Sequence, residues 1–299
     1  MTRPESPVKG TALRLSPDEV QSYREQGLLL PRRVLSPEEA TACLRELEAY
    51  ESSGGGPIAG KWRYKSHLVF PWLNQLMRHP AILDLACSLL GEDVMVWTTH
   101  IYPKEADDGR FISWHQDSAH WGLDSNRVLS VWVALTDATR ENGCMRMLPG
   151  SHHKGEVIHQ DTWDPNNILT RGQTIEEPIN EDKAVWVELE AGEASIHHVD
   201  LFHASTANVS PGRRVAVAIR YITPEARQTR IDEDYATLVC GEDRFGHFIP
   251  EIVPNTTMAP EAISFHERIA ELQGQIYLSN TDRAGLTGLK ETSDGNSTT

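Results

Sequence analysis

A series of short β-type runs, beginning at Val94, constrains the fold of this chain more than any other feature. Several runs alternate apolar and polar residues, and turn-forming stretches such as EADDG, RENG and SPG separate them. The runs are VMVWTTHIYP, RFISWHQD, RVLSVWVALTD, GCMRMLPG, AVWVELEAGEASIHH and RRVAVAIRYITP. Many short strands of this kind favour an antiparallel sandwich or a jelly roll. We therefore predict a mainly β fold with flanking helices.

Helix signals stand on both sides of the β-type runs. Ser16-Pro17-Asp18-Glu19 and Ser36-Pro37-Glu38-Glu39 each combine a capping serine, a proline at the first helical position and a glutamate three residues after the serine. A third helix is predicted in HPAILDLACSLLG, where Gly91 is a natural C-terminal stop. The stretch PEAISFHERIAELQGQIYL predicts a further helix near the C-terminus.

These signals predict one domain over residues 1–287. Its helical N-terminal part, about 16–91, is expected to buttress a jelly-roll core at about 94–223. A C-terminal extension would carry the last helix at about 260–278. Residues 288–299 are poor in apolar side chains and are predicted to be a disordered tail.

The stretch from about His152 to Asp182 is polar and irregular in sequence. A loop of this length inside a compact domain is usually functional. We expect it to act as a lid.

Composition excludes several classes of protein. Hydrophobic content of 39% and charged content of 24% are ordinary for a globular protein. The N-terminus lacks the apolar region of a secretory signal, and no run is long and apolar enough to cross a membrane, so we predict a cytoplasmic protein. Four widely spaced cysteines argue against a disulfide framework or a thiolate zinc site. The net charge of −15 opposes binding to nucleic acid or anionic membranes and is compatible with a cationic or zwitterionic small substrate; the sequence leaves the oligomeric state open.

The most informative polar motif is His115-Gln116-Asp117. Residues i and i+2 of a strand point to the same face, so this imidazole and carboxylate would project side by side. A later histidine would complete a facial triad, which leaves three positions of an octahedral Fe(II) open for a bidentate 2-oxoacid and O2. The candidates for this third ligand are His197, His198 and His203.

Arg214 favours His203 among these candidates. It follows that histidine by eleven residues and begins a β-type run. A carboxylate co-substrate needs a cation at the far end of its pocket, and the planar guanidinium binds a carboxylate through two hydrogen bonds. Arg213, one residue earlier, should point to the opposite face of the strand.

Three segments carry a family resemblance: WHQDSAHWGL, VWVALTDATRENGCMRMLPGSHHKG and HHVDLFHASTANVSPGRR. Together they resemble the phytanoyl-CoA dioxygenase family of Fe(II)- and 2-oxoglutarate-dependent oxygenases. The resemblance implies a double-stranded β-helix, a cupin-like jelly roll of two sheets with iron between them and helices on one side.

The same resemblance implies a set of site residues. The iron ligands would be His115, Asp117 and His203. The residues of the 2-oxoglutarate pocket would be Arg214, Ser205, Gln116, Trp132 and His100, of which the first two bind the distal carboxylate. Candidates for substrate contact around the site are His120, Trp121, Arg146, His159, Asn167 and Arg171.

The implied function is hydroxylation of an unactivated C–H bond in a small polar molecule, with Fe(II), 2-oxoglutarate and O2, releasing succinate and CO2. Aminoalkylphosphonates, amino-acid-like molecules and natural-product intermediates are the substrate classes expected. Halogenating relatives replace the carboxylate ligand by a small residue, so Asp117 favours a hydroxylase. The alternatives are a metal-dependent hydrolase, which would need a nearby general base, and a non-catalytic jelly-roll binding protein. The triad together with Arg214 argues against both.

Overall fold

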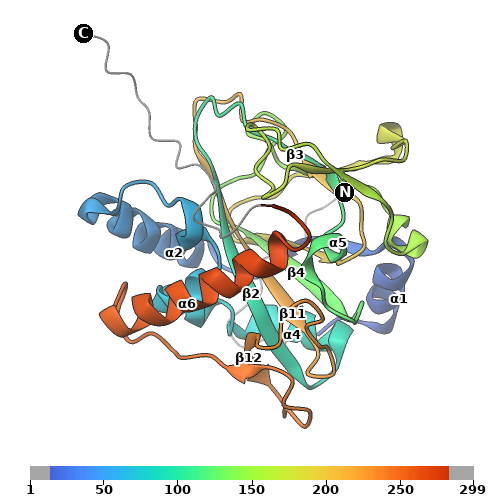
Figure 1. Ribbon diagram of the computed structural model, residues 1–299. Helices are drawn as coiled ribbons and strands as arrows, with labels where there is room; N and C mark the ends of the chain where they lie inside the picture. The colour runs from blue at the N-terminus through green and yellow to red at the C-terminus, as the bar shows by residue number, and fades with distance from the viewer. Residues whose placement is uncertain (1–13, 283–299) are drawn as a thin grey trace.

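Two sheets lie at the centre of the computed structural model, which describes residues 14–282. The larger sheet has seven strands, in the spatial order β1 (Leu28–Arg33), β9 (Glu193–His198), β4 (Val128–Ala134), β11 (Arg214–Ile222), β2 (Val94–Lys104), β12 (Tyr235–Cys240) and β13 (Ile249–Pro250). The smaller sheet has four, in the order β3 (Ile112–His115), β10 (His203–Ser205), β5 (Met145–Met147) and β8 (Val185–Val187). Neighbouring strands are antiparallel, apart from the short β12–β13 pair (Figure 1). This arrangement confirms the predicted fold class.

Six α-helices are described, namely α1 (Pro17–Gln26), α2 (Pro37–Tyr50), α3 (Pro71–Leu76), α4 (Pro80–Leu90), α5 (Ser118–Trp121) and α6 (Pro260–Tyr277). Of these, α1, α2, α4 and α6 were predicted and α3 and α5 were not. Short 3-10 or π turns are η1 (Glu51–Gly55), η2 (Gly60–Arg63), η3 (Ser66–Leu68), η4 (Ser151–Lys154) and η5 (Glu181–Lys183). Both predicted capping boxes form, because the Ser16 and Ser36 hydroxyls each accept the N–H of the glutamate three residues on and each glutamate accepts the serine N–H in return. Gly91 ends α4 with a φ of 103°, which a glycine adopts without strain.

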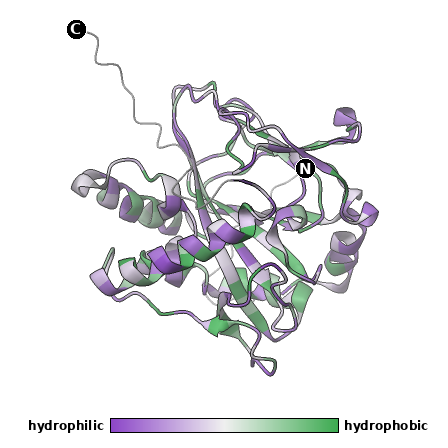
Figure 2. Ribbon diagram, viewed as in Figure 1, coloured by the Kyte–Doolittle hydropathy of each residue, from purple (hydrophilic) through white to green (hydrophobic). Residues whose placement is uncertain are grey.

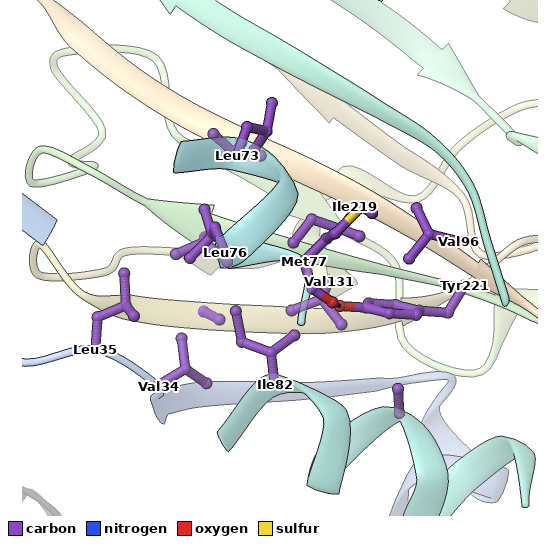
Figure 3. Close-up of a cluster of buried hydrophobic side chains, with 14 of the residues drawn as sticks. Val34, Leu35, Leu73, Leu76, Met77, Ile82, Val96, Val131, Ile219 and Tyr221 are labelled. Carbon is purple, nitrogen blue, oxygen red and sulfur yellow. Dashed lines mark hydrogen bonds between the residues drawn. The ribbon is translucent and has the colours of Figure 1, made fainter. Parts of the chain in front are cut away.

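The larger sheet separates two clusters of buried side chains through the alternation of its strands. On β11, Val215, Val217, Ile219 and Tyr221 belong to the main hydrophobic core, which also contains residues of α2, α3 and α4. Figure 3 shows part of this core, where the Tyr221 hydroxyl donates a hydrogen bond of 2.8 Å to the Met77 carbonyl. Hydrophobic residues accordingly gather along the central strands, whereas α1, α2 and α6 carry both hydrophilic and hydrophobic ones (Figure 2).

The opposite face of β11 turns toward the smaller sheet. Ala216 and Ala218 lie there, in a second cluster that includes Trp132 of β4 and Met145 and Met147 of β5. Two small side chains in the middle of the strand leave room between the sheets. That room is where the polar residues of the site gather.

A buried polar cluster joins the N-terminal helical part to the C-terminal extension. The Glu251 carboxylate lies 2.6 Å from Lys65 Nζ and 2.8 Å from His67 Nε2, and it accepts a hydrogen bond of 2.7 Å from the Thr237 hydroxyl. Lys65 also donates to the Tyr235 carbonyl at 2.6 Å. Because every donor faces an acceptor, the ion pair is tolerated away from water.

Several details differ from the sequence predictions. The run AVWVELEAGEASIHH contains two strands, β8 and β9, that belong to different sheets. The stretch 152–182 is not irregular throughout, because β6 (His159–Asp161) and β7 (Gln173–Ile175) pair in a small antiparallel sheet. β1, β10, β12 and β13 were not predicted as strands. The predicted tail, 288–299, lies outside the described residues. Within residues 14–282, no helix is long and apolar enough to span a membrane.

Glu251→Gln tests the buried cluster. Burial opposes ionisation of Glu251, but Lys65 and His67 outweigh it and lower the pKa of the carboxyl to about 2. Removing the negative charge leaves a buried ammonium uncompensated, which costs roughly 3–5 kcal/mol of stability at pH 7. Because the folded pKa is depressed, this contribution is present above the ordinary carboxyl value of 4.5 and disappears as the pH falls toward 2.

Urea unfolding at pH 7 and at successively lower pH measures this difference. Glu267→Gln is the matched control, because Glu267 forms an exposed ion pair with Lys61 and should change stability little. Equal stability of Glu251→Gln and the parent at pH 7 would contradict the assigned role.

Candidate active site

Three buried side chains converge between the two sheets. Strands β3 and β10 pair so that His115 and His203 are direct cross-strand partners. Asp117 Oδ1 lies 3.7 Å from His115 Nε2 and 3.9 Å from His203 Nε2. The ligand atoms of all three residues lie within 4.8 Å of one another. Two imidazole nitrogens and one carboxylate oxygen at this spacing form a facial triad, the donor set of non-haem Fe(II) oxygenases.

Backbone carbonyls orient both imidazoles. His115 Nδ1 lies 2.9 Å from the Ser113 carbonyl, and His203 Nδ1 lies 2.9 Å from the Leu201 carbonyl. A proton on each Nδ1 donates to that carbonyl, which leaves the Nε2 lone pair free for a metal. Burial and the neighbouring His115 hold the pKa of His203 well below its ordinary value, so this imidazole is neutral and able to coordinate.

Asp117 reaches the triad from a turn and not from a strand. Strand β3 ends at His115, and Asp117 has helical backbone angles (φ −68°, ψ −36°) directly before α5. The predicted proximity to His115 is therefore found, but the predicted strand geometry is wrong. Asp117 Oδ2 accepts a hydrogen bond of 3.2 Å from Ser130, and the same oxygen lies 3.7 Å from His197 Nε2. Burial would raise the pKa of Asp117, but His115, His197 and nearby cations outweigh it and keep the carboxylate ionised.

Two buried cations face each other at the far end of the same space. Arg214 of β11 and Lys104 of β2 are cross-strand partners, exposed by only 2% and 1%. Neither has a carboxylate within 4.0 Å among residues 14–282. Burial, with Arg214 adding to it, lowers the pKa of Lys104 to about 7, and burial lowers the pKa of Arg214 to about 10. Like charges directly opposite each other are destabilising, so this pair suits an anionic ligand.

Neutral partners hold both cations in place. The Arg214 guanidinium lies over the Trp132 ring, 5.2 Å from its centroid, and donates to the Gly143 carbonyl at 3.1 Å. Lys104 Nζ donates to the Ser205 hydroxyl at 2.8 Å and to the Thr206 carbonyl. The polar groups are thus fixed before any ligand arrives, which lowers the entropic cost of binding.

A pocket of about 490 Å³ connects the cations with the histidines of the triad. His115 and His203 line one end, and Arg214, Lys104 and Ser205 line the other. One end offers metal ligands with open coordination positions, and the other offers donors for a carboxylate. The residues present therefore fit Fe(II) together with a dicarboxylate such as 2-oxoglutarate.

A second pocket, of about 460 Å³, lies against Asp117 and α5. It shares Tyr102, His115, Ile168 and Arg220 with the first. Its other lining residues are Tyr64, His100, Gln116, Asp117, His120, Trp121, Leu169, Thr170, Gln173 and Tyr277. The polar loop at 168–173 thus forms part of its wall.

The predicted co-substrate residues divide between the two pockets. Ser205, Trp132 and Arg214 line the first, whereas Gln116 and His100 line the second. The Gln116 side chain donates to the carbonyls of Gly155 and Asp200, at 2.8 and 2.7 Å, and accepts the N–H of Val157. Its amide therefore holds surrounding loops together.

Two of the six predicted substrate contacts, His120 and Trp121, line the second pocket. The other four, which line neither pocket, are Arg146, His159, Asn167 and Arg171. Arg146 pairs with Glu181, and Arg171 pairs with Asp161. Asn167 donates to Ser113 at 2.7 Å, and His159 accepts the backbone N–H of Gln116 at 3.0 Å. Each of these four side chains thus has a partner within the chain.

Sequence reasoning missed Lys104 and Arg220. Arg220 follows Arg214 by an even number of residues on one strand, so alternation alone could have placed it on the same face. Lys104 carries no such signal, because a single lysine at a strand end is ordinarily a surface residue.

Comparisons with known proteins agree with this geometry. The profile of the family Phytanoyl-CoA dioxygenase (PhyH) matches residues 23–216, more than half of the chain. Ectoine dioxygenase of Bordetella bronchiseptica is 28% identical over 237 residues, which cover 71% of this chain and 76% of that protein. L-proline trans-4-hydroxylase of Streptomyces griseoviridis is 30% identical over 166 residues, which cover 49% of this chain and 61% of that protein.

A solved structure, the non-heme monooxygenase ThoJ in its apo form, superposes with a TM-score of 0.73. It is 36% identical in sequence, and the match covers 86% of this chain and 98% of that one. The fold, the triad and the sequence match agree, and they confirm Fe(II) and 2-oxoglutarate as the cofactor and co-substrate. The chain belongs to the phytanoyl-CoA dioxygenase family of Fe(II)- and 2-oxoglutarate-dependent dioxygenases.

Proposed function

We propose that this enzyme hydroxylates a C–H bond of a small polar molecule, with iron held by His115, Asp117 and His203. 2-Oxoglutarate would lie in the first pocket, with its distal carboxylate between Arg214 and Lys104. The observation that carries this proposal is a pair of buried cations, without a carboxylate partner within residues 14–282, that shares one pocket with the two histidines of the triad. A metal site alone would fit many reactions, whereas a metal site with a built carboxylate receptor fits a 2-oxoacid.

The residues of the chain divide the work by position. When bound, the iron, 2-oxoglutarate and O2 supply the oxidation of an unreactive C–H bond and yield succinate and CO2. Arg214 binds the distal carboxylate through its planar fork, and Lys104 adds a second charge while orienting the Ser205 hydroxyl. Trp132 supports the guanidinium from one side. Ser130 and His197 hold Asp117 from the larger sheet, so each ligand meets the metal from a fixed direction.

Asp117 supports hydroxylation over halogenation. Its carboxylate occupies the position at which halogenating relatives have a small residue, and two polar neighbours hold it there. The similarity to a proline hydroxylase and to ectoine dioxygenase supports a small polar substrate. The two buried cations in the same pocket argue against a hydrolase, because hydrolysis with this donor set does not require them. The triad argues against a non-catalytic binding protein, because such a protein does not require a metal site.

Anaerobic titration with Fe(II) and 2-oxoglutarate tests the proposal. The enzyme should develop a weak visible charge-transfer band that needs both additions. No band with saturating metal and co-substrate would exclude the proposed function.

Removing a ligand should remove the metal. We expect His203→Ala and Asp117→Ala to weaken Fe(II) binding by at least about a hundredfold, because a tridentate site loses a third of its donors. His198→Ala is the matched control, since this half-buried histidine lies on the same segment but faces Asp200. Metal dissociation constants measured by competition with a chelator compare the three variants. Loss of iron from His198→Ala with retention by His203→Ala would overturn the ligand assignment.

Arg214→Ala should weaken 2-oxoglutarate binding by about two to three and a half orders of magnitude, which corresponds to roughly 3–5 kcal/mol for removing one partner of a buried charged pair. Arg214→Lys should recover only part of the affinity, since an ammonium keeps the charge but loses the fork. Arg213→Ala is the control, because Arg213 points the other way and pairs with Glu51 at 2.7 Å and Glu105 at 2.9 Å. Dissociation constants measured with an inert metal in place of iron give the comparison. Equal weakening by Arg213→Ala and Arg214→Ala would refute the assignment.

Lys104 predicts a pH dependence of co-substrate binding. Burial and Arg214 lower its pKa to about 7 in the free protein, and a bound carboxylate favours the charged form. The affinity for 2-oxoglutarate should therefore be full below pH 7 and fall as the pH rises above it. Lys104→Met should bind more weakly at pH 6.5 and lose this slope. Titrations from pH 6.5 to 8.5 at saturating metal measure the 2-oxoglutarate dissociation constant of both proteins. An equal change of this constant with pH in Lys104→Met and in the parent would contradict the role of the lysine.

A further inference from the structure

Arg220 stands at the boundary of the two pockets and lines both. It lies on the same face of β11 as Arg214, with Ala216 and Ala218 between them. Only 6% of its surface is exposed. Its guanidinium carbon lies 5.5 Å from the ring centroids of both Tyr102 and Trp121. The two rings fix the direction of the guanidinium group without supplying a charge.

The hydrogen-bonding capacity of Arg220 is only partly used. One terminal nitrogen donates to the Tyr102 hydroxyl at 3.0 Å, and the other makes a long contact of 3.4 Å with the Ala218 carbonyl. Within residues 14–282, its buried Nε has no hydrogen-bond partner, and no carboxylate oxygen lies within 4.0 Å of its nitrogens. Arg146 and Arg171, by contrast, each pair with a carboxylate. A buried guanidinium with free donors beside a pocket is a receptor for an anion.

Charges in the second pocket favour an anionic ligand. Among the described residues that line it, Arg220 is the only lysine or arginine and Asp117 the only carboxylate. Asp117 belongs to the triad, so its charge is committed to the metal ion when one is bound. Asp117 then acts on Arg220 only at a distance, since no carboxylate oxygen within residues 14–282 lies within 4.0 Å of the guanidinium nitrogens. An ammonium group on a ligand would likewise meet no uncommitted carboxylate among the described residues that line the pocket.

The other residues that line the second pocket indicate the chemistry of the rest of the ligand. Tyr64, Trp121, Tyr277 and Leu169 contribute aromatic and aliphatic side chains to the lining, beside polar ones from Gln116, Thr170 and Gln173. His120 adds a buried Nε2 without a hydrogen-bond partner among the described residues. One guanidinium neutralises the single negative charge of a carboxylate, whereas the second charge of a phosphonate dianion would meet no further lysine or arginine among the described residues that line this pocket. Because these aromatic and aliphatic side chains lie in one pocket with Arg220, they can pack against the body of a ligand whose anionic group binds the guanidinium.

We propose that Arg220 binds a carboxylate group of the primary substrate in the second pocket, and that the substrate class is small carboxylic acids with an apolar or aromatic body. The inference rests on the proposed function and selects carboxylates over aminoalkylphosphonates. Because Arg220 and Asp117 line the same pocket, a carboxylate at Arg220 brings neighbouring carbon atoms of the substrate to the metal side of that pocket.

Calorimetry on the full chain, loaded with Zn(II) and saturating 2-oxoglutarate, tests this proposal. The probes are benzoate, 3-phenylpropionate and 4-phenylbutyrate, each beside its neutral amide. At least one carboxylate should bind about tenfold more tightly than its amide, as expected for hydrogen bonds to a charged group. Arg220→Gln should reduce that preference to within about threefold while leaving 2-oxoglutarate affinity within about threefold of the parent.

Three further variants distinguish a role of Arg220 in substrate binding from a role in 2-oxoglutarate binding and from a loss of folding. Arg214→Gln should weaken 2-oxoglutarate binding yet keep the carboxylate preference once 2-oxoglutarate is saturating. Arg140→Gln changes an exposed arginine paired with Glu188, and it should alter neither the 2-oxoglutarate affinity nor the preference for a carboxylate over its amide. If Arg220→Gln loses the folded circular dichroism signal, Arg220→Lys carries the test, and a reduced preference supports the proposal while an unchanged one refutes it.

Three results would overturn the inference: no carboxylate preferred over its amide by the parent, the preference retained without Arg220, or 2-oxoglutarate weakened by Arg220→Gln as much as by Arg214→Gln. The last result would assign Arg220 to the co-substrate. Failure of the proposed function is distinguishable, because it would abolish the Fe(II)–2-oxoglutarate absorption band of the parent whatever the calorimetry gives.

Discussion

The active site depends on two positive charges that the fold holds directly opposite each other and away from water. Arg214 and Lys104 are buried cross-strand partners, at the start of β11 and the end of β2, and no carboxylate among the described residues lies within 4.0 Å of either. In an ordinary core this pair would be destabilising. Here it faces a pocket whose other end is lined by the two histidines of the triad, and in our proposal a bound dicarboxylate offsets the unfavourable contact.

Strand alternation allows one segment to serve both the core and the site. The odd residues of β11 pack against the helices, which supplies the hydrophobic burial that stabilises the fold. The even-numbered residues of β11 face the pockets. They include Arg214 and Arg220, and the two alanines between them leave space for ligands. The chain carries a net charge of −15, yet the two pockets collect three cations. The net charge of the whole protein therefore says little about the charge of its substrate.

Local signals were predictable from the sequence, and contacts between distant segments were not. Capping serines and Gly91 fix helix ends through hydrogen bonds within a few residues, so the sequence alone places them. The histidines of the triad and Arg214 were found because their spacing is itself a signal. Lys104 was missed because its burial comes from pairing with β11, far along the chain. The ion pairs of Arg146 and Arg171 were not predictable, because their partners, Glu181 and Asp161, lie in a segment whose path the sequence does not reveal.

Thermal unfolding of the parent and of Lys104→Met, each with and without Zn(II) and 2-oxoglutarate, tests the central claim most directly. If the two cations are strained until an anion binds, Lys104→Met should melt at a higher temperature than the parent in the absence of ligands, because the repulsion from Arg214 is gone. When Zn(II) and 2-oxoglutarate are added, the melting temperature of Lys104→Met should rise by less than that of the parent. A variant that melts lower without ligands and gains as much as the parent with them would show that Lys104 is a structural residue, and it would contradict the account of the carboxylate receptor.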